Sequence, residues 1–506
     1  MRKKKALYSI VTNLNLQLVV IIYGFIVPKI IISHFGSDVN GLISSITQFL
    51  AYITLLESGF GPVVKSALYK PIANKNKSEI ANILKTAERF FRKIAIIFIA
   101  YIIILCFIYP IIISNKFDTV FTVSLIIIIS ISTFAEYFFG MTYRLYLQAD
   151  QKNYIISLIQ IFTYILSAIA IVILAMFNFS IEIIKLVSGL IFVLRPILQN
   201  VYVKKKYDIN LNNADNNYLL KQKWDGLAQH IASVIHTNTD VTVLTIFSSL
   251  SEVSVYSVYY LVVRGIKQIA QSFSTGIDSS FGDMIAKNEH HNLNEKFELY
   301  EILYFTVIAI LFSSTIILIT PFITVYTNGI KDANYIRYLF GILITISEYI
   351  WAIRLPYSSL TLAAGHFKQT QVGAWVECVL NIILSVILVQ RYGIIGVAIG
   401  TIIAMLVRTI EFVYHANKYI LKRNMLKSLK KILVLLLETI LVVLVFNIIP
   451  LLSKISYLTW IINAVIVLLI VILITCLLNT IFYRKMMKKI MNLFFRKKGK
   501  NEKHKF

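Results

Sequence analysis

Long apolar stretches, separated by short polar segments, recur along nearly the whole chain. Each stretch reaches about 20 residues, the length that an α-helix needs to cross the hydrocarbon core of a bilayer. The pattern therefore predicts an all-α polytopic membrane protein with about fourteen transmembrane helices. Their approximate ranges are 7–33, 40–62, 94–114, 118–140, 154–177, 180–203, 228–249, 253–280, 299–322, 335–362, 371–390, 393–415, 428–452 and 456–482.

The composition agrees with this pattern. The 506 residues are 58% hydrophobic and their mean hydropathy is +0.74, which is too apolar for a water-soluble protein with one buried core. The first apolar run follows a basic N-terminus, as in a secretory signal, but it is long and lacks a small-residue cleavage site, so we expect it to be retained. The three cysteines lie inside predicted spans without CxxC spacing and indicate neither disulfides nor a metal site.

The formal net charge of +25 would point to nucleic-acid binding in a soluble protein. Here the basic residues gather in alternate connections between the spans, whereas the intervening connections hold only Lys116, Lys331, Arg391 and Lys454. This distribution follows the positive-inside rule and predicts that both termini are cytoplasmic. The basic tail 484–506 directly follows the last span, which favours contact with lipid headgroups over binding of RNA.

Two pairs of segments resemble each other at an offset of about 215 residues: 147–174 with 362–389, and 69–91 with 282–305. They predict a duplicated unit of six spans, so that both copies have the same orientation about an axis along the membrane normal. We therefore expect an N-terminal lobe at 1–215, a C-terminal lobe at 216–427, two additional helices at 428–483, and the tail. Two such lobes would enclose a cleft, which indicates transport by alternating access.

Charged residues within the predicted spans are the main functional candidates. A charge at the centre of a bilayer costs at least about 2.5–3.5 kcal/mol, so each must pair, reach the headgroups or line a hydrated cavity. The basic candidates for binding an anionic substrate are Arg195, Arg264, Lys267, Arg354, Arg408 and Lys29.

Alternatives exist for several of these cations. Arg264 and Lys267 share a helical face, and they either face an anionic headgroup or pair with an internal acid such as Glu348 or Asp240. Arg408 is expected to pair with Glu411 and can also extend to the cytoplasmic headgroups. Lys29 either guides an anion or, as we favour, reaches the headgroups.

Polar oxygens gather at one predicted depth of the C-terminal lobe. Asp240 lies in the middle of the seventh span, Glu377 and Asn381 share a face of the eleventh, and Thr401 lies in the twelfth. Carboxylate, amide and hydroxyl oxygens suit a small hard cation, and coupling to Na⁺ would explain a carboxylate at this depth. The alternative is a polar cluster that forms hydrogen bonds across helices.

Several stretches together resemble one known family. They are VNGLISSITQFLAYITLLESGFGP at 39–62, TDVTVLTIFSSLSEVSVYSVYY at 239–260, LAAGHFKQT at 362–370 and RYGIIGVAIGT at 391–401. In this order they are similar to the polysaccharide-export flippases, the O-antigen and capsule repeat-unit (Wzx-type) members of the multidrug/oligosaccharidyl-lipid/polysaccharide exporter (MOP) superfamily. The resemblance extends over the entire chain.

The resemblance implies a flippase, not an enzyme, that moves an undecaprenyl-pyrophosphate-linked oligosaccharide across the bacterial plasma membrane. Relatives that flip lipid II can bind sodium between spans 7, 11 and 12, which by position implies Asp240, Asn381 and Thr401, with Glu377 one turn away. No cofactor is implied beyond a coupling Na⁺ or proton. The implied partners are the lipid-linked substrate, the bilayer and other membrane proteins of polysaccharide assembly. Nucleic acid is not an implied partner.

Two other functions fit parts of the sequence. A MATE-type antiporter for cationic drugs shares the two-lobe plan, but its cavity would favour acids or aromatics over the basic candidates named above. A membrane-embedded glycan polymerase or ligase would need a sizeable external loop. The longest outward connection, 323–334, is short and holds only one acid, Asp332, which argues against that enzyme.

Overall fold

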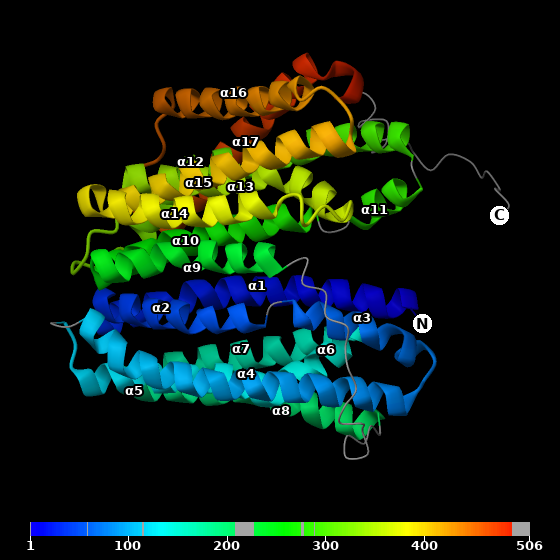
Figure 1. The fold of residues 1–506 in the computed structure, drawn as a ribbon. Coiled ribbons are helices and arrows are strands. Elements are labelled where there is room, and N and C mark those ends of the chain that lie inside the picture. The colour runs from blue at the N-terminus through cyan, green and yellow to red at the C-terminus, as the bar shows by residue number, and fades with distance from the viewer. Residues whose placement is uncertain are drawn as a thin grey trace. The chain divides into compact units, whose positions relative to one another are not determined.

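The structure is a computed structural model that describes residues 2–57, 59–113, 116–207, 227–274, 278–287 and 289–487. The described residues are mostly helical and form no strand (Figure 1). The helices in the N-terminal part are α1 (Arg2–Phe35), α2 (Ser37–Ala51), α3 (Phe60–Ala73), α4 (Lys77–Ile112), α5 (Thr119–Ala135), α6 (Met141–Ala149), α7 (Asn153–Met176) and α8 (Ile181–Tyr207).

Nine further α-helices follow along the described part of the chain. They are α9 (Leu227–Phe247), α10 (Leu250–Ser272), α11 (Asp278–Ala286), α12 (His290–Tyr326), α13 (Tyr338–Ala363), α14 (Gln371–Tyr392), α15 (Ile394–His415), α16 (Leu426–Ile448) and α17 (Tyr457–Phe482). Three short segments have other helical geometry: a 3₁₀ turn, η1 (Tyr52–Leu56), and two π turns, η2 (Glu136–Gly140) and η3 (Ala416–Ile420).

Each predicted span overlaps a helix, although the span predicted at 253–280 runs past the end of α10 at Ser272. Eleven helical segments of the described chain are long and apolar enough to cross a membrane. This confirms a multi-pass helical membrane protein. The other three predicted spans correspond to α8, α9 and α10, which have 27, 21 and 23 residues. At 1.5 Å per residue each reaches the roughly 30 Å of a hydrocarbon core.

The second predicted span, 40–62, is wrong at its C-terminal end. The helix α2 tightens into η1 and ends before Gly59, which has a left-handed conformation with φ of 76°. Glycine adopts positive φ without the steric cost that a Cβ imposes, so it allows the chain to turn here. A separate helix, α3, then begins at Phe60.

Polar residues at helix starts explain several boundaries. Asn76 accepts a hydrogen bond from the backbone N–H of Glu79 and begins α4, and Asp118 accepts one from Val120 and begins α5. Ser456 does the same for α17. Such caps satisfy N–H groups that have no partner within the helix.

The chain divides into two compact units. The first comprises Met1–Leu261, Gly329–Asn334 and Ala374–Ala404, and the second comprises Val262–Asn328, Tyr335–Gly373 and Met405–Phe506. In the first unit α1 packs along α7, while α5 packs against α4 and α8 (Figure 1). In the second unit α12 contacts α13, α16 and α17.

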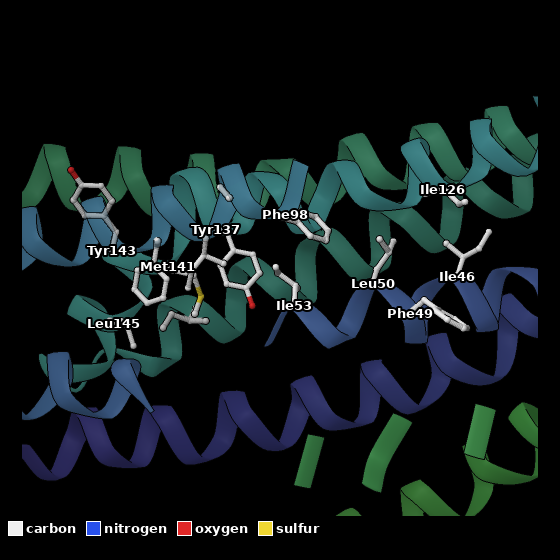
Figure 2. Close-up of a cluster of buried hydrophobic side chains, with 14 of the residues drawn as sticks. Ile46, Phe49, Leu50, Ile53, Phe98, Ile126, Tyr137, Met141, Tyr143 and Leu145 are labelled. Atoms are coloured by element: carbon white, nitrogen blue, oxygen red, sulfur yellow. The ribbon is translucent and has the colours of Figure 1, made fainter. Parts of the chain in front are cut away.

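A buried apolar cluster holds the first unit together. Ile46 and Leu50 of α2 pack in it with Phe98 of α4 and Ile126 of α5 (Figure 2). Because lipid tails are as apolar as these side chains, helix association in a membrane depends on close packing and interhelical hydrogen bonds. Leu50, Phe98 and Ile126 are at most 3% exposed, as such packing requires.

Candidate functional site

Asp240 lies on α9 and is 6% exposed, with both carboxylate oxygens occupied by hydroxyl donors. Tyr256 of α10 donates to Oδ2 and Thr401 of α15 donates to Oδ1, each at 2.9 Å. Asn381 of α14 donates from Nδ2 to Thr401 Oγ1, also at 2.9 Å. The structure thus brings Asp240, Thr401 and Asn381 into one hydrogen-bonded cluster, the Asp240 cluster.

Small residues allow α14 and α15 to approach within reach of this cluster. A Cβ at Gly400, next to Thr401, would lie 2.8 Å from the backbone N of Ser385. One turn earlier, a Cβ at Gly396 would lie 2.2 Å from the Leu388 carbonyl oxygen. Glycines at helix contacts permit backbones to pack closely, and here they bring Thr401 opposite Asn381.

Two polar atoms near the Asp240 cluster have no hydrogen-bond partner. They are Asn381 Oδ1 and Ser385 Oγ, four residues apart on α14, and both side chains are fully buried. A buried polar group that is left without a partner costs about 1–3 kcal/mol, so an ion or a water molecule bound here would relieve that cost. Glu377, 7% exposed, lies one turn before Asn381 on the same helix.

The chemistry of these donors fits a hard monovalent cation. The oxygens of Asp240, Thr401 and Asn381 are the ligand type that such ions prefer. The described residues contain no group of three or more His, Cys, Asp or Glu side chains that could hold a metal ion, so a site here would combine one or two carboxylates with neutral oxygens. The unpartnered Asn381 Oδ1 would supply a lone pair to such an ion.

Lys267 of α10 forms an ion pair with Glu348 of α13 at 2.8 Å, and its ammonium lies 4.4 Å from the centre of the Trp351 ring. This is the internal pairing that the sequence offered as an alternative to headgroup binding. Arg264, one turn earlier on α10, is exposed, and Arg354 of α13 is half-buried. No ion pair of Arg264 occurs in the described part of the chain.

Arg408 forms the predicted ion pair with Glu411 on α15. The expectation that Arg408 can extend to the headgroups is wrong, because its side chain is 2% exposed and its Nη1 also donates to the Thr370 carbonyl at 2.8 Å. Glu411 lies over Gly373, where a Cβ would be 1.6 Å from Oε2. A side chain at position 373 would therefore displace the Glu411 carboxylate.

Arg195 of α8 lies in the first unit, far along the chain from the Asp240 cluster. Its Nε donates to Thr163 of α7 at 2.8 Å, and its guanidinium carbon lies about 4 Å from the ring centres of Tyr164 and Phe192. Its Nη2 is buried without a hydrogen-bond partner. Lys29, on α1 after Pro28, is half-buried.

A cavity of about 330 Å³ lies beside Arg195, in the first unit. It is lined by Thr54, Glu57, Ser132, Thr133, Glu136, Tyr137, Met141, Arg144, Gln160, Phe192, Arg195 and Gln199. We name it the N-terminal cavity. Among its residues only Arg195 was a sequence-based candidate for substrate binding, although Glu136, within the predicted span 118–140, was a signal that could have drawn attention to the cavity.

A second feature that sequence reasoning missed is a buried ionic hub in the second unit. Glu301 of α12 is fully buried and pairs with Arg423 at 3.0 Å and with Lys431 of α16. Its carboxylate also accepts hydrogen bonds from Tyr357 and Ser428. Glu301 lies in the first turn of the predicted span 299–322, where an acid normally meets water, so its burial was not expected.

These helices define a multi-pass helical membrane protein with buried charges and, in its first unit, a polar cavity. A solved structure of the lipid II flippase MurJ, in an inward closed conformation, is similar with a TM-score of 0.65 and 18% identity, covering 95% of this chain and 100% of that chain. The sequence matches no protein-family model and no curated protein.

Multidrug transporters share the fold as well. An inward-facing multidrug resistance MATE family transporter of the MOP superfamily has a TM-score of 0.62 and 13% identity, covering 81% of this chain and 97% of that chain. A mutant of the Vibrio cholerae MATE transporter VcmN has a TM-score of 0.51 and 14% identity, covering 84% and 98%. These similarities establish the fold and leave the substrate to be argued from the residues.

Proposed function

We propose that this protein is a flippase that moves an undecaprenyl-pyrophosphate-linked oligosaccharide repeat unit across the bacterial plasma membrane, for capsule or O-antigen assembly. The observation that carries the proposal is the likeness to the lipid II flippase, which extends over 95% of this chain and all of that one. The match to the MATE transporter leaves about a fifth of this chain uncovered. That length is comparable to residues 428–506, which include α16 and α17.

The proposed architecture has two six-helix lobes, at 1–215 and 216–427, followed by α16, α17 and the basic tail. Support comes from the order of the helices: a short helix precedes a long one at α3–α4 and again at α11–α12, and α4 and α12 begin at Lys77 and His290. With α8, α9 and α10 crossing as well, the chain would have fourteen spans and two cytoplasmic termini. Substrate would move by alternating access between the lobes.

Among the cationic candidates, Arg264 and Arg354 are proposed to bind the pyrophosphate. Arg264 is preferred to Lys267 and Arg408 because each of those two pairs with an internal acid, which lowers its capacity to attract a second anion. Arg264 is exposed in a helix of a membrane protein, and an exposed charge at that depth needs water or an anion. Arg195 and Lys29 are proposed to assist along the path of the glycan.

The Asp240 cluster is proposed to couple transport to Na⁺, with protons as the alternative ion. Asp240, Asn381 and Thr401 would hold the cation, and Glu377 would contribute if its side chain turns toward them. A bound Na⁺ would supply positive charge against the buried carboxylate. For Asp240 and Thr401 to ligate it, the Tyr256 and Thr401 hydroxyl protons that now lie on the carboxylate would have to rotate away.

Deletion of the gene in its own bacterium tests the function. The proposal predicts that lipid-linked repeat units accumulate on the cytoplasmic leaflet and that surface polysaccharide disappears, with both restored by the intact chain. If the protein is instead a MATE-type antiporter, deletion will leave the polysaccharide intact and increase sensitivity to cationic drugs. Co-purification with other polysaccharide-assembly membrane proteins would identify partners.

A further inference from the structure

The N-terminal cavity has two buried polar groups that lack partners. Gln199 of α8 is 1% exposed and its Oε1 accepts no hydrogen bond, while Nη2 of Arg195 donates none. One is an acceptor and the other is a donor. Buried polar groups in proteins normally have hydrogen-bond partners, so an unmet donor and an unmet acceptor in one cavity wall point to a polar occupant.

The cavity wall is electrically balanced. Glu57 and Glu136 supply two carboxylates, and Arg144 and Arg195 supply two guanidinium groups. Glu136 and Arg144 pair with each other at 2.9 Å. A pyrophosphate would meet two carboxylates here, and a cation would meet two arginines, so neither a strong anion nor a cation fits this lining well.

A neutral, polyhydroxylated molecule does fit. Each sugar hydroxyl both donates and accepts a hydrogen bond, which matches a wall of carboxylates, guanidinium groups, amides and hydroxyls. Tyr137 and Phe192 add aromatic surfaces for the apolar face of a sugar ring. The volume of about 330 Å³ lies at the low end of roughly 300–1,000 Å³ for small-molecule pockets, which suits one sugar residue better than a chain.

Neighbouring side chains hold Arg195 in one orientation before a ligand binds. Thr163 binds its Nε, and the rings of Tyr164 and Phe192 flank the guanidinium, so few side-chain rotations remain to be lost on binding. We infer that the N-terminal cavity is a saccharide subsite, which receives one uncharged sugar residue of the carried glycan through Arg195, Gln199 and Glu57. The identity of the sugar as part of the cargo rests on the proposed function, whereas its binding does not.

The test uses the purified full-length protein and free sugars. D-glucose, D-galactose and N-acetyl-D-glucosamine are each added at about 100 mM, well above the Kd of roughly 1 mM expected for a weak sugar site. Binding of each sugar and the rise in the unfolding temperature of the protein are measured. At least one of them should bind, and inorganic pyrophosphate and tetraphenylphosphonium should not compete with it. Absence of binding by all three sugars, or displacement by either ion, overturns the inference.

Variants locate the site. Gln199→Leu should weaken sugar binding by about tenfold or more, which corresponds to the loss of one or more hydrogen bonds. The control is Asn479→Leu, which replaces another buried amide that has an unpartnered atom but lies on α17, outside the cavity. Equal binding by Gln199→Leu and the wild type overturns the inference.

Glu57→Gln keeps the shape and makes the wall net positive. It should weaken binding of the neutral sugar and favour D-glucuronate, whereas unchanged selectivity contradicts the subsite. Transport of lipid-linked glycan by the same preparations separates the two proposals. Transport without sugar binding refutes the subsite alone, and sugar binding without transport refutes the flippase function alone.

Discussion

Gly41 of α2 lies directly against the backbone carbonyl of Leu250, at the start of α10: a Cβ on Gly41 would be 1.8 Å from that oxygen. Hydrogen bonds flank this contact on both sides. Asn40 Nδ2 donates to Ser254 Oγ at 2.8 Å, and the Ser45 and Thr245 hydroxyls are 2.7 Å apart. A glycine contact with polar pairs along it is a typical way to join transmembrane helices.

Replacement of Gly41 by leucine should therefore separate α2 from α10. We expect the overpacked contact to cost about 1–3 kcal/mol and the polar pairs beside it to loosen. The thermal unfolding temperature of the purified protein measures this, and surface polysaccharide measures its consequence. Gly282→Ala serves as the control because nothing lies within 4 Å of a Cβ at that glycine. Unchanged stability of the Gly41 variant would contradict the close packing.

Asp240→Asn should abolish any response to sodium while leaving the protein folded. Asparagine has the same shape, and the Tyr256 and Thr401 hydroxyls can rotate to accommodate it, but the charge that attracts Na⁺ is lost. The measurement is the shift in unfolding temperature between sodium chloride and choline chloride, which needs no transport. Asp118→Asn, at the exposed start of α5, is the control. A sodium shift that persists in Asp240→Asn would leave the cluster with a structural role only.

Arg264→Ala or Arg354→Ala should abolish surface polysaccharide while each variant stays in the membrane at normal levels. The reason is that both residues are proposed to bind the pyrophosphate of the substrate. Immunoblots of membranes and polysaccharide stains provide the two readouts. Normal polysaccharide in both variants would refute a cationic headgroup site at these positions.

Glu301→Gln should strongly destabilise the second unit. Loss of the carboxylate charge leaves Arg423 and Lys431 buried, 7% and 5% exposed, without their shared counterion. Breaking such a pair typically costs about 3–5 kcal/mol. The unfolding temperature should fall clearly, and Glu301→Gln combined with Lys431→Met should recover part of the loss because it removes one of the two cations that lose Glu301 as a counterion. A double variant no better than the single one would contradict this pairing.

Hydropathy predicted the helices well because a bilayer imposes both length and apolar character on each span. The spacing of charged residues predicted the Arg408–Glu411 pair, because residues three apart share a helical face. The sequence did not predict the N-terminal cavity or the Glu301 hub. Both depend on which faces of distant helices meet, and the charges involved lie near span ends, where acids and bases are common and carry little signal.

The pattern of apolar positions also could not predict the π turns or the end of α2. Hydropathy does not distinguish a π turn from an α turn, because both bury the same residue types over so short a length. The end of α2 was misplaced for a similar reason: Gly59 is one of several glycines in spans, and only its positive φ marks it as a turn.

The π turn at Glu136–Gly140 has a consequence for the spacing of charges along the chain. Glu136 and Arg144 are eight residues apart. In a regular α-helix this separation is not a whole number of turns, so the two side chains would point in different directions around the helix axis. A π turn absorbs one extra residue, so the pair behaves as if seven apart, which is two full turns on one face. Deleting one residue of this turn would restore a regular α-helix and leave the pair seven residues apart on one face, whereas inserting a residue would turn the guanidinium away from its carboxylate.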